Sequence, residues 1–247
     1  MRVAFMRLIR RFYRCAFVVA VGVALCQPIR GLADGPSYGQ MATLGRYIIA
    51  NRTAEIVLAR SAAPPSISLN ATVLVLTTRG YETAERGSNG FTCLVERSWA
   101  KAFDDTEFWN PKIRAPVCYN PAASRSILPY TIFRTQIVLS RTTKALMLER
   151  LQSAIAEKRL PAFEAGSMAY MMSKEQYLSD SAMPSASWHA HVMLYAPAAD
   201  AAGAGASWGA DRRGSPVVFD DSHRVGPEPW TVFFVPVAHW SDGSASS

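Results

Sequence analysis

The chain has 247 residues, of which 49% are hydrophobic and 18% charged, with a formal net charge of +7. This length is enough for an ordinary hydrophobic core, and the composition excludes a disordered tail, a collagen-like repeat and a disulfide-dense mini-protein. Residues 1–33 hold six of the 26 basic residues and none of the 19 acidic ones, so the rest is nearly neutral and lacks the basic excess that a nucleic-acid partner requires.

Residues 1–33 are typical of an export signal. A basic stretch ends at Arg14, and the uncharged run 15–26 follows. As a helix, this run spans about 18 Å, which is short of the roughly 30 Å hydrocarbon core of a membrane. The small residues Gly31 and Ala33 predict cleavage before Asp34, with a retained N-terminal anchor as the alternative.

The expected product is therefore an exported protein, periplasmic or secreted, that meets the membrane only through this signal. Arg10-Arg11 resembles a twin-arginine export motif, which would carry the protein across already folded. Ile9 stands where that motif usually has Ser or Thr, so the ordinary secretory route is favoured.

Cysteine usage agrees with export. Cys15 and Cys26 belong to the signal, so the mature chain keeps only Cys93 and Cys118. One pair in an oxidising compartment predicts a disulfide, which would stabilise the fold by about 3.5 kcal/mol. The alternatives are two buried thiols or a cysteine-based metal site, but the spacing is far wider than in zinc ribbons.

The first half of the mature chain predicts one helix and two strands. Apolar residues recur at helical spacing over 41–60, and short β-branched runs at 72–77 and 91–97 predict strands. The polar segment between those runs would make them a long-looped β-hairpin. Residues 98–117, which are aromatic and acidic, are expected to form an ordered loop.

The second half predicts further helices and three strands. Asn120-Pro121 is a favourable helix start, Pro129 should break or kink that helix, and Thr142 or Thr143 should begin another through Lys158. The expected strands are 168–172, 188–195 and 230–237. Together these elements predict a single α+β domain over 34–247, with a mainly antiparallel sheet of about five strands and two or three helices.

The sharpest chemical motif is Trp188-His189-Ala190-His191. On a strand, His189 and His191 would point to the same face and share an ion, for which neutral imidazoles suit Zn, Cu, Fe or Ni. A catalytic zinc needs three protein ligands and an open water position. The third ligand could come from a later part of the chain, where the candidates are Asp220, Asp221, His223 and His239. The alternative is that both histidines bond to neighbours at the sheet edge, with no cofactor.

Weaker signals are also present. Residues 205–209 match the nucleophile elbow G-x-S-x-G around Ser207, but the flanking residues do not predict its strand–turn–helix context. Asp104, Asp105 and Glu107 adjoin aromatic residues and could line a carbohydrate cleft, although a solvated acidic loop is favoured. Glu96 should face away from the neighbouring Cys93 and Val95, and we expect it to be exposed.

Five segments carry a resemblance: 89–99 (NGFTCLVERSW), 108–112 (FWNPK), 170–173 (YMMS), 188–191 (WHAH) and 240–243 (WSDG). Together they resemble a family of uncharacterised exported bacterial proteins. The resemblance covers most of the chain beyond about residue 45. It implies export and no particular activity, so it transfers no catalytic residue.

Three functional hypotheses follow. The leading one is an exported, non-enzymatic protein that binds a small molecule or an envelope partner through Trp99, Trp109 and Trp188. The second is a metal-dependent hydrolase that uses the His-x-His motif. The third is a structural envelope protein without a ligand. An apolar pocket would favour the first, a third converging ligand in an open cleft the second, and neither feature the third.

Overall fold

The computed structural model describes residues 38–180, 189–197, 219–220 and 226–246, with backbone only at 219–220. The described residues all belong to one compact unit. Within the described ranges, no helix is long and apolar enough to cross a membrane.

The described strands form one mixed sheet. They are β1 (Thr72–Thr77), β2 (Gly80–Glu85), β3 (Thr92–Glu96), β4 (Ala115–Tyr119), β5 (Met168–Met171), β6 (His191–Pro197), β7 (Phe219–Asp220) and β8 (Trp230–Pro236). Their order is β2-β1-β3-β4-β5-β6-β8-β7. Only the β1–β3 pairing is parallel, and the other neighbours are antiparallel. The predicted α+β class is confirmed, but the sheet has eight strands instead of about five, the two-residue β7 included.

The described helices are also more numerous than the two or three expected. They are the short 3-10 turns η1 (Leu44–Arg46) and η2 (Ser98–Ala100), and the α-helices α1 (Arg52–Arg60), α2 (Pro65–Ser68), α3 (Pro121–Ser126), α4 (Leu128–Leu139) and α5 (Lys144–Ala156).

The helix starts predicted from capping residues in the second half of the chain are confirmed. The side chain of Asn120 accepts a 2.9 Å hydrogen bond from the amide of Ala123 and begins α3, and Thr143 caps α5 in the same way. Pro129 lies in the first turn of α4, so it separates α3 from α4 as predicted. The long helix expected over 41–60 is wrong at its start, because Asn51 caps α1 through the amide of Ala54.

Two strands lie where loops were expected. The polar segment after β1 turns back as β2, so the hairpin is β1–β2, and β3 then pairs with β1 in parallel on its other side. The predicted β1–β3 hairpin is therefore wrong. Strand β4 occupies the end of the expected loop 98–117 and is buried at every position.

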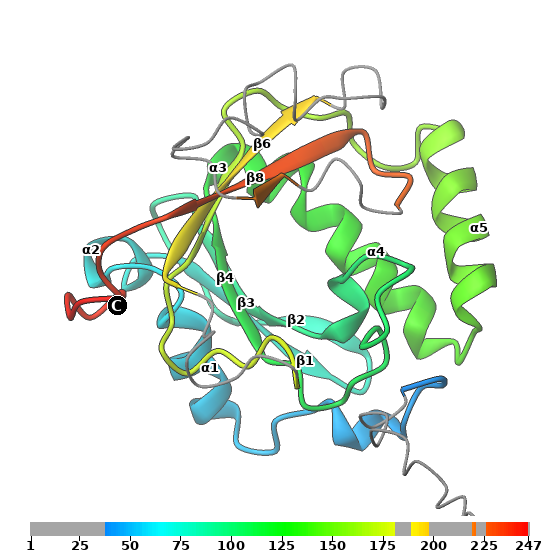
Figure 1. Cartoon of the computed structure of the whole chain (residues 1–247), viewed down its shortest axis with the longest axis horizontal. Helices are drawn as coiled ribbons and strands as arrows, with labels where there is room; N and C mark the ends of the chain where they lie inside the picture. Colours follow the sequence, from blue (N-terminus) through cyan, green and yellow to red (C-terminus); the bar gives the residue numbers. More distant parts are fainter. Residues whose placement is uncertain (1–37, 181–188, 198–218, 221–225, 247) are drawn as a thin grey trace, which may run out of the picture. The chain divides into compact units, whose positions relative to one another are not determined.

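The central strands are covered on both faces. Cys93 and Val95 of β3 pack with the Ala59 face of α1, whereas Leu94 packs with α3 and the start of α4. Figure 1 shows α1 and α4 on different sides of strands β1–β4. Because successive strand residues alternate between faces, Glu96 shares the α4 side with Leu94.

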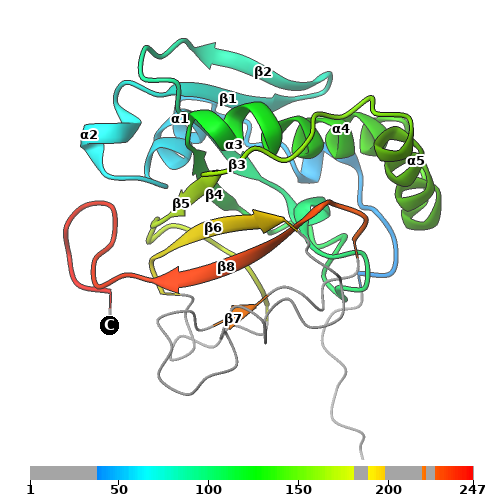
Figure 2. The same ribbon diagram turned by 90° about the horizontal axis from the view of Figure 1, so that it is seen from above.

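The sheet curves around α4. This helix packs against β2 at one edge, and its Tyr130 ring meets the Trp230 ring of β8 at 4.5 Å near the other edge. Figure 2 shows β6 and β8 running side by side, as their pairing requires. The concave face of the sheet and α4 therefore enclose the space in which the site is found.

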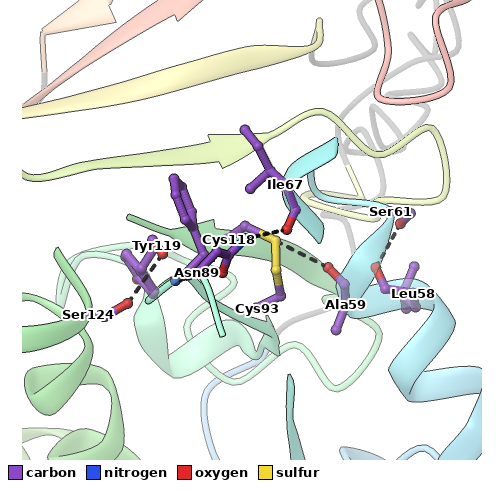
Figure 3. Close-up of a disulfide and its surroundings, with 10 residues drawn as sticks. Leu58, Ala59, Ser61, Ile67, Asn89, Cys93, Cys118, Tyr119 and Ser124 are labelled. Atoms are coloured by element: carbon purple, nitrogen blue, oxygen red, sulfur yellow. Dashed lines mark hydrogen bonds between the residues drawn. A yellow bond between two sulfur atoms is a disulfide. The ribbon is translucent and has the colours of Figure 1, made fainter. Parts of the chain in front are cut away.

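The predicted disulfide is present between Cys93 and Cys118, which are direct partners in the β3–β4 register (Figure 3). Both residues are fully buried, and the Cys118 Sγ atom lies 3.8 Å from the carbonyl oxygen of Ala59 on α1. The bond thus joins two central strands beneath α1.

Candidate functional site

A cavity of about 280 Å³ lies between α4 and the concave face of the sheet. Apolar side chains from β4, β5, β6 and β8 form much of its wall, among them Ala115, Met171, Met193 and Val232. Polar side chains enter it from β3, α4 and the segment after η2. An apolar cavity with a few convergent polar groups is the usual form of a small-molecule site.

The central polar group is the carboxylate of Glu96, at the end of β3. Its Oε1 atom accepts a hydrogen bond of 2.7 Å from the Tyr119 hydroxyl and one of 2.8 Å from the Thr131 hydroxyl of α4. Glu96 is half-buried, which corrects the expectation that it is simply solvent-exposed. No ion pair joins it to a described basic residue.

Tyr119 is well suited to remain a donor to this carboxylate. Burial raises the pKa of Tyr119 well above its usual value, and the negative charge of Glu96 raises it further. The phenol therefore stays protonated over the physiological range, so the hydrogen bond to Glu96 persists.

The basic residues that line the cavity are already paired. Lys101 binds Asp105 at 2.9 Å, and Arg97 binds the buried Glu55 of α1 at 2.7 Å. Arg134 of α4 donates to the carbonyl groups of residues 99 and 101 and forms a buried ion pair with Glu228, just before β8. These pairs connect the elements of the cavity wall. None of the three basic residues forms an ion pair with Glu96.

A cluster of aromatic side chains lines the same cavity. The Trp230 ring makes an edge contact with Tyr130 of α4 at 4.5 Å and with Tyr195 of β6 at 6.3 Å. All three residues, and Tyr119, line the cavity. Aromatic rings offer apolar surface and an electron-rich face to a ligand.

The structure places His191 in the same cavity. The residue is 3% exposed, and its Nδ1 atom lies 2.8 Å from the carbonyl oxygen of His189. Burial lowers the pKa of His191, although the His189 carbonyl opposes that shift, so the neutral imidazole prevails at neutral pH.

The other predicted metal ligands do not join His191 in the described part of the chain. His189 and His239 are exposed, and Asp221 and His223 lie outside the described residues. Only the backbone of Asp220 is described, in β7. Across residues 38–180, 189–197 and 226–246, no three His, Cys, Asp or Glu side chains come close enough to hold a metal ion. The full ligand set stays a prediction.

The predicted aromatic binding surface is placed differently. Trp99 and Trp109 are 1% and 4% exposed and belong to a core cluster, where the Trp99 indole donates to the Thr135 hydroxyl at 2.9 Å. This corrects the expectation that these two side chains face a ligand, because they pack the interior beside α4. Trp188 lies outside the described residues.

The acidic segment is only partly a solvated loop. Asp104 is exposed, but Asp105 and Glu107 both pair with Lys101, and Glu107 also accepts a hydrogen bond from the amide of Asp180. These acids therefore brace the segment. The G-x-S-x-G match around Ser207 lies outside the described residues.

Sequence reasoning missed the polar centre of the cavity. One usable signal was present, because Leu94 and its neighbours Cys93 and Val95 are apolar on both faces of β3. A strand buried on both faces leaves no solvent-facing side for Glu96.

Comparisons with protein-family models, with curated proteins and with solved structures gave no match.

Proposed function

We propose that this is an exported bacterial protein, periplasmic or secreted, that binds a small molecule in the cavity between α4 and the sheet. One observation carries the proposal: the cavity is mainly apolar, yet it holds the Glu96 carboxylate between two hydroxyl donors. Such a polar group fixes the orientation of a ligand whose apolar part fills the rest of the space.

Two observations support export. The basic, then apolar, then small-residue order of residues 1–33 is typical of a signal peptide. The Cys93–Cys118 disulfide is consistent with an oxidising compartment.

The binding proposal is tested by filling the cavity. Ala115→Leu places an isobutyl group into it, whereas Ala162→Leu makes the same change at an exposed position. A small-molecule library is screened for compounds that raise the melting temperature of the wild-type protein. Hits should also stabilise the Ala162→Leu variant and should not stabilise the Ala115→Leu variant.

Equal responses of the two variants would place binding elsewhere and contradict the proposal. A library without any wild-type hit would favour the structural envelope role. Val232→Phe, a second filling variant, covers the case in which Ala115→Leu does not fold.

A metal-dependent hydrolase is the second candidate, favoured by the position of His191 in the same wall. Metal-binding histidines commonly bond through one ring nitrogen to a backbone carbonyl, as His191 does to that of His189. Mass spectrometry of the untagged protein should then find about one equivalent of Zn, Cu, Fe or Ni per chain. A folded His189→Ala/His191→Ala variant should lose it. Absence of metal after incubation with each ion would eliminate this candidate.

A further inference from the structure

We infer that the ligand is a small organic cation whose ammonium group binds Glu96 and the aromatic rings beside it. The inference rests on the proposed function and names the chemical class of the molecule that the cavity takes. Charge pairing, ring placement and size carry it.

The charge argument starts from the cavity wall. Arg97, Lys101 and Arg134 each have an acidic partner, which is Glu55, Asp105 or Glu228 respectively. Among the residues that the structure describes, the partners of Glu96 are the hydroxyls of Tyr119 and Thr131. The wall therefore presents one carboxylate that no described cation neutralises.

The partial burial of the Glu96 carboxylate favours the binding of a positively charged ligand. Both hydroxyls donate to Oε1, and no described residue donates to Oε2. A half-buried carboxylate loses part of its hydration, and an opposite charge within a few ångströms restores the lost stabilisation. An anionic ligand would be repelled, and a neutral apolar ligand would gain nothing from Glu96.

The aromatic residues fit the same ligand. Tyr119, Tyr195 and Trp230 line the cavity, and Trp230 contacts Tyr195 edge-on. Ring faces attract ammonium groups, and the attraction strengthens when the cation is removed from water. A cavity lined by a carboxylate and by tyrosine and tryptophan rings thus supplies both a charge and an apolar surface.

Size restricts the class further. The volume of about 280 Å³ is near the lower limit of ordinary ligand pockets, roughly 300 Å³. The cavity suits a compact quaternary or primary ammonium compound and is too small for a folded peptide.

The test compares cations with uncharged analogues of similar shape. Choline is paired with the alcohol in which carbon replaces its quaternary nitrogen, and butylammonium is paired with butanol. Binding to the mature protein is measured by calorimetry and by tryptophan fluorescence. The variants are Glu96→Gln, which keeps the shape and removes the charge, and Glu149→Gln, which changes an exposed carboxylate on α5.

At least one cation should bind the wild-type and Glu149→Gln proteins about tenfold more tightly than its neutral analogue, and Glu96→Gln should abolish that preference. Equal affinity for the members of each pair, or a preference that survives Glu96→Gln, would overturn the inference. The inference would also be overturned if neither cation binds while neutral library compounds bind to the wild type and not to the Ala115→Leu variant. In that case the proposed function stands. If no compound of either set depends on Ala115, the proposed function itself fails.

Discussion

The hydroxyl of Tyr119 reaches Oε1 of Glu96 at 2.7 Å, although Tyr119 pairs with Thr92 in the register of β3 and β4. The two long side chains extend toward each other along the sheet, and Leu94 pairs with Val117 between them. The hydrogen bond therefore lies across the concave face, where it fixes the carboxylate at the cavity wall.

Removal of this hydroxyl should destabilise the protein. Tyr119→Phe leaves Oε1 of Glu96 with Thr131 as its remaining donor among the described residues, which should cost about 1–3 kcal/mol in the free energy of unfolding. Urea denaturation measures the loss. Tyr170→Phe is the control, since the Tyr170 hydroxyl makes no hydrogen bond to a described residue, and an equal loss in both variants would contradict the assignment.

The Arg134–Glu228 pair should contribute more. Their side chains are only 3% and 7% exposed, so Glu228→Ala leaves a buried guanidinium without its acid and should cost about 3–5 kcal/mol. Glu157→Ala removes the acid of the exposed pair with Arg159 and should have no measurable effect on the urea midpoint. Similar midpoints for the two variants would show that the buried pair does not hold α4 to the segment before β8.

Loss of the disulfide should lower stability without changing the fold. The double variant Cys93→Ala/Cys118→Ala should lose about 3.5 kcal/mol, because its unfolded chain gains the entropy that the cross-link removes. The wild-type protein measured in a reducing agent is the matched comparison. Coincident unfolding curves for the oxidised wild type and the double variant would refute this contribution.

Asp180 should make stability depend on pH. Burial by itself would raise the pKa of Asp180, but hydrogen bonds from Tyr177, Tyr38 and Lys112 outweigh it and lower that pKa well below its usual value. Because the folded state has the lower pKa, the stabilisation is present above the unfolded pKa of about 3.8 and is lost as the pH falls below it.

The corresponding variant is Asp180→Asn. It should be less stable than the wild type by about 1–2 kcal/mol at neutral pH, and the difference should shrink as acid protonates Asp180 in the unfolded state of the wild type. Denaturation series from pH 7 down to about pH 3 compare the two proteins. A difference that stays constant over this range would contradict the predicted linkage.

The proposed export signal in residues 1–33 predicts a defined mature N-terminus. Protein recovered from the periplasm or the medium should begin at Asp34, as read by N-terminal sequencing and intact mass. Ala33→Arg should block cleavage, whereas Arg10→Lys/Arg11→Lys should leave export unchanged on the ordinary secretory route. Recovery of the full-length chain from the cytoplasm alone would refute export.

Local signals in the sequence predicted much of the fold. Asn120, Pro121 and Thr143 mark helix starts because capping and a fixed φ act within a few residues, and β-branched runs found β1 and β3. Strand β4 was missed because Pro116 lies inside it, and prolines usually argue against a central strand. Strand β2 was missed because its polar residues lie on an edge strand with little burial.

The site was harder to predict, since its residues meet only through tertiary structure. Alternation assigned Glu96 to the right face of β3, but it could not show that α4 covers that face and supplies Thr131. Trp99 and Trp109 looked like a binding surface because aromatic residues serve cores and ligand sites equally well, and packing alone decides between them.

The contacts of β8 and the segment before it with α4 determine when the cavity forms during folding. Glu228 and its partner Arg134 are 94 residues apart in the chain, and Trp230 meets Tyr130 at a similar separation. Contacts so distant in sequence close late, after local hairpins and helices have formed. If the proposed signal exports the chain by the secretory route, the chain would cross the membrane before the proposed binding site had formed, and a ligand would bind only outside the cytoplasm. On the twin-arginine route, the same closure would finish first, and the protein could carry a cytoplasmic ligand out with it.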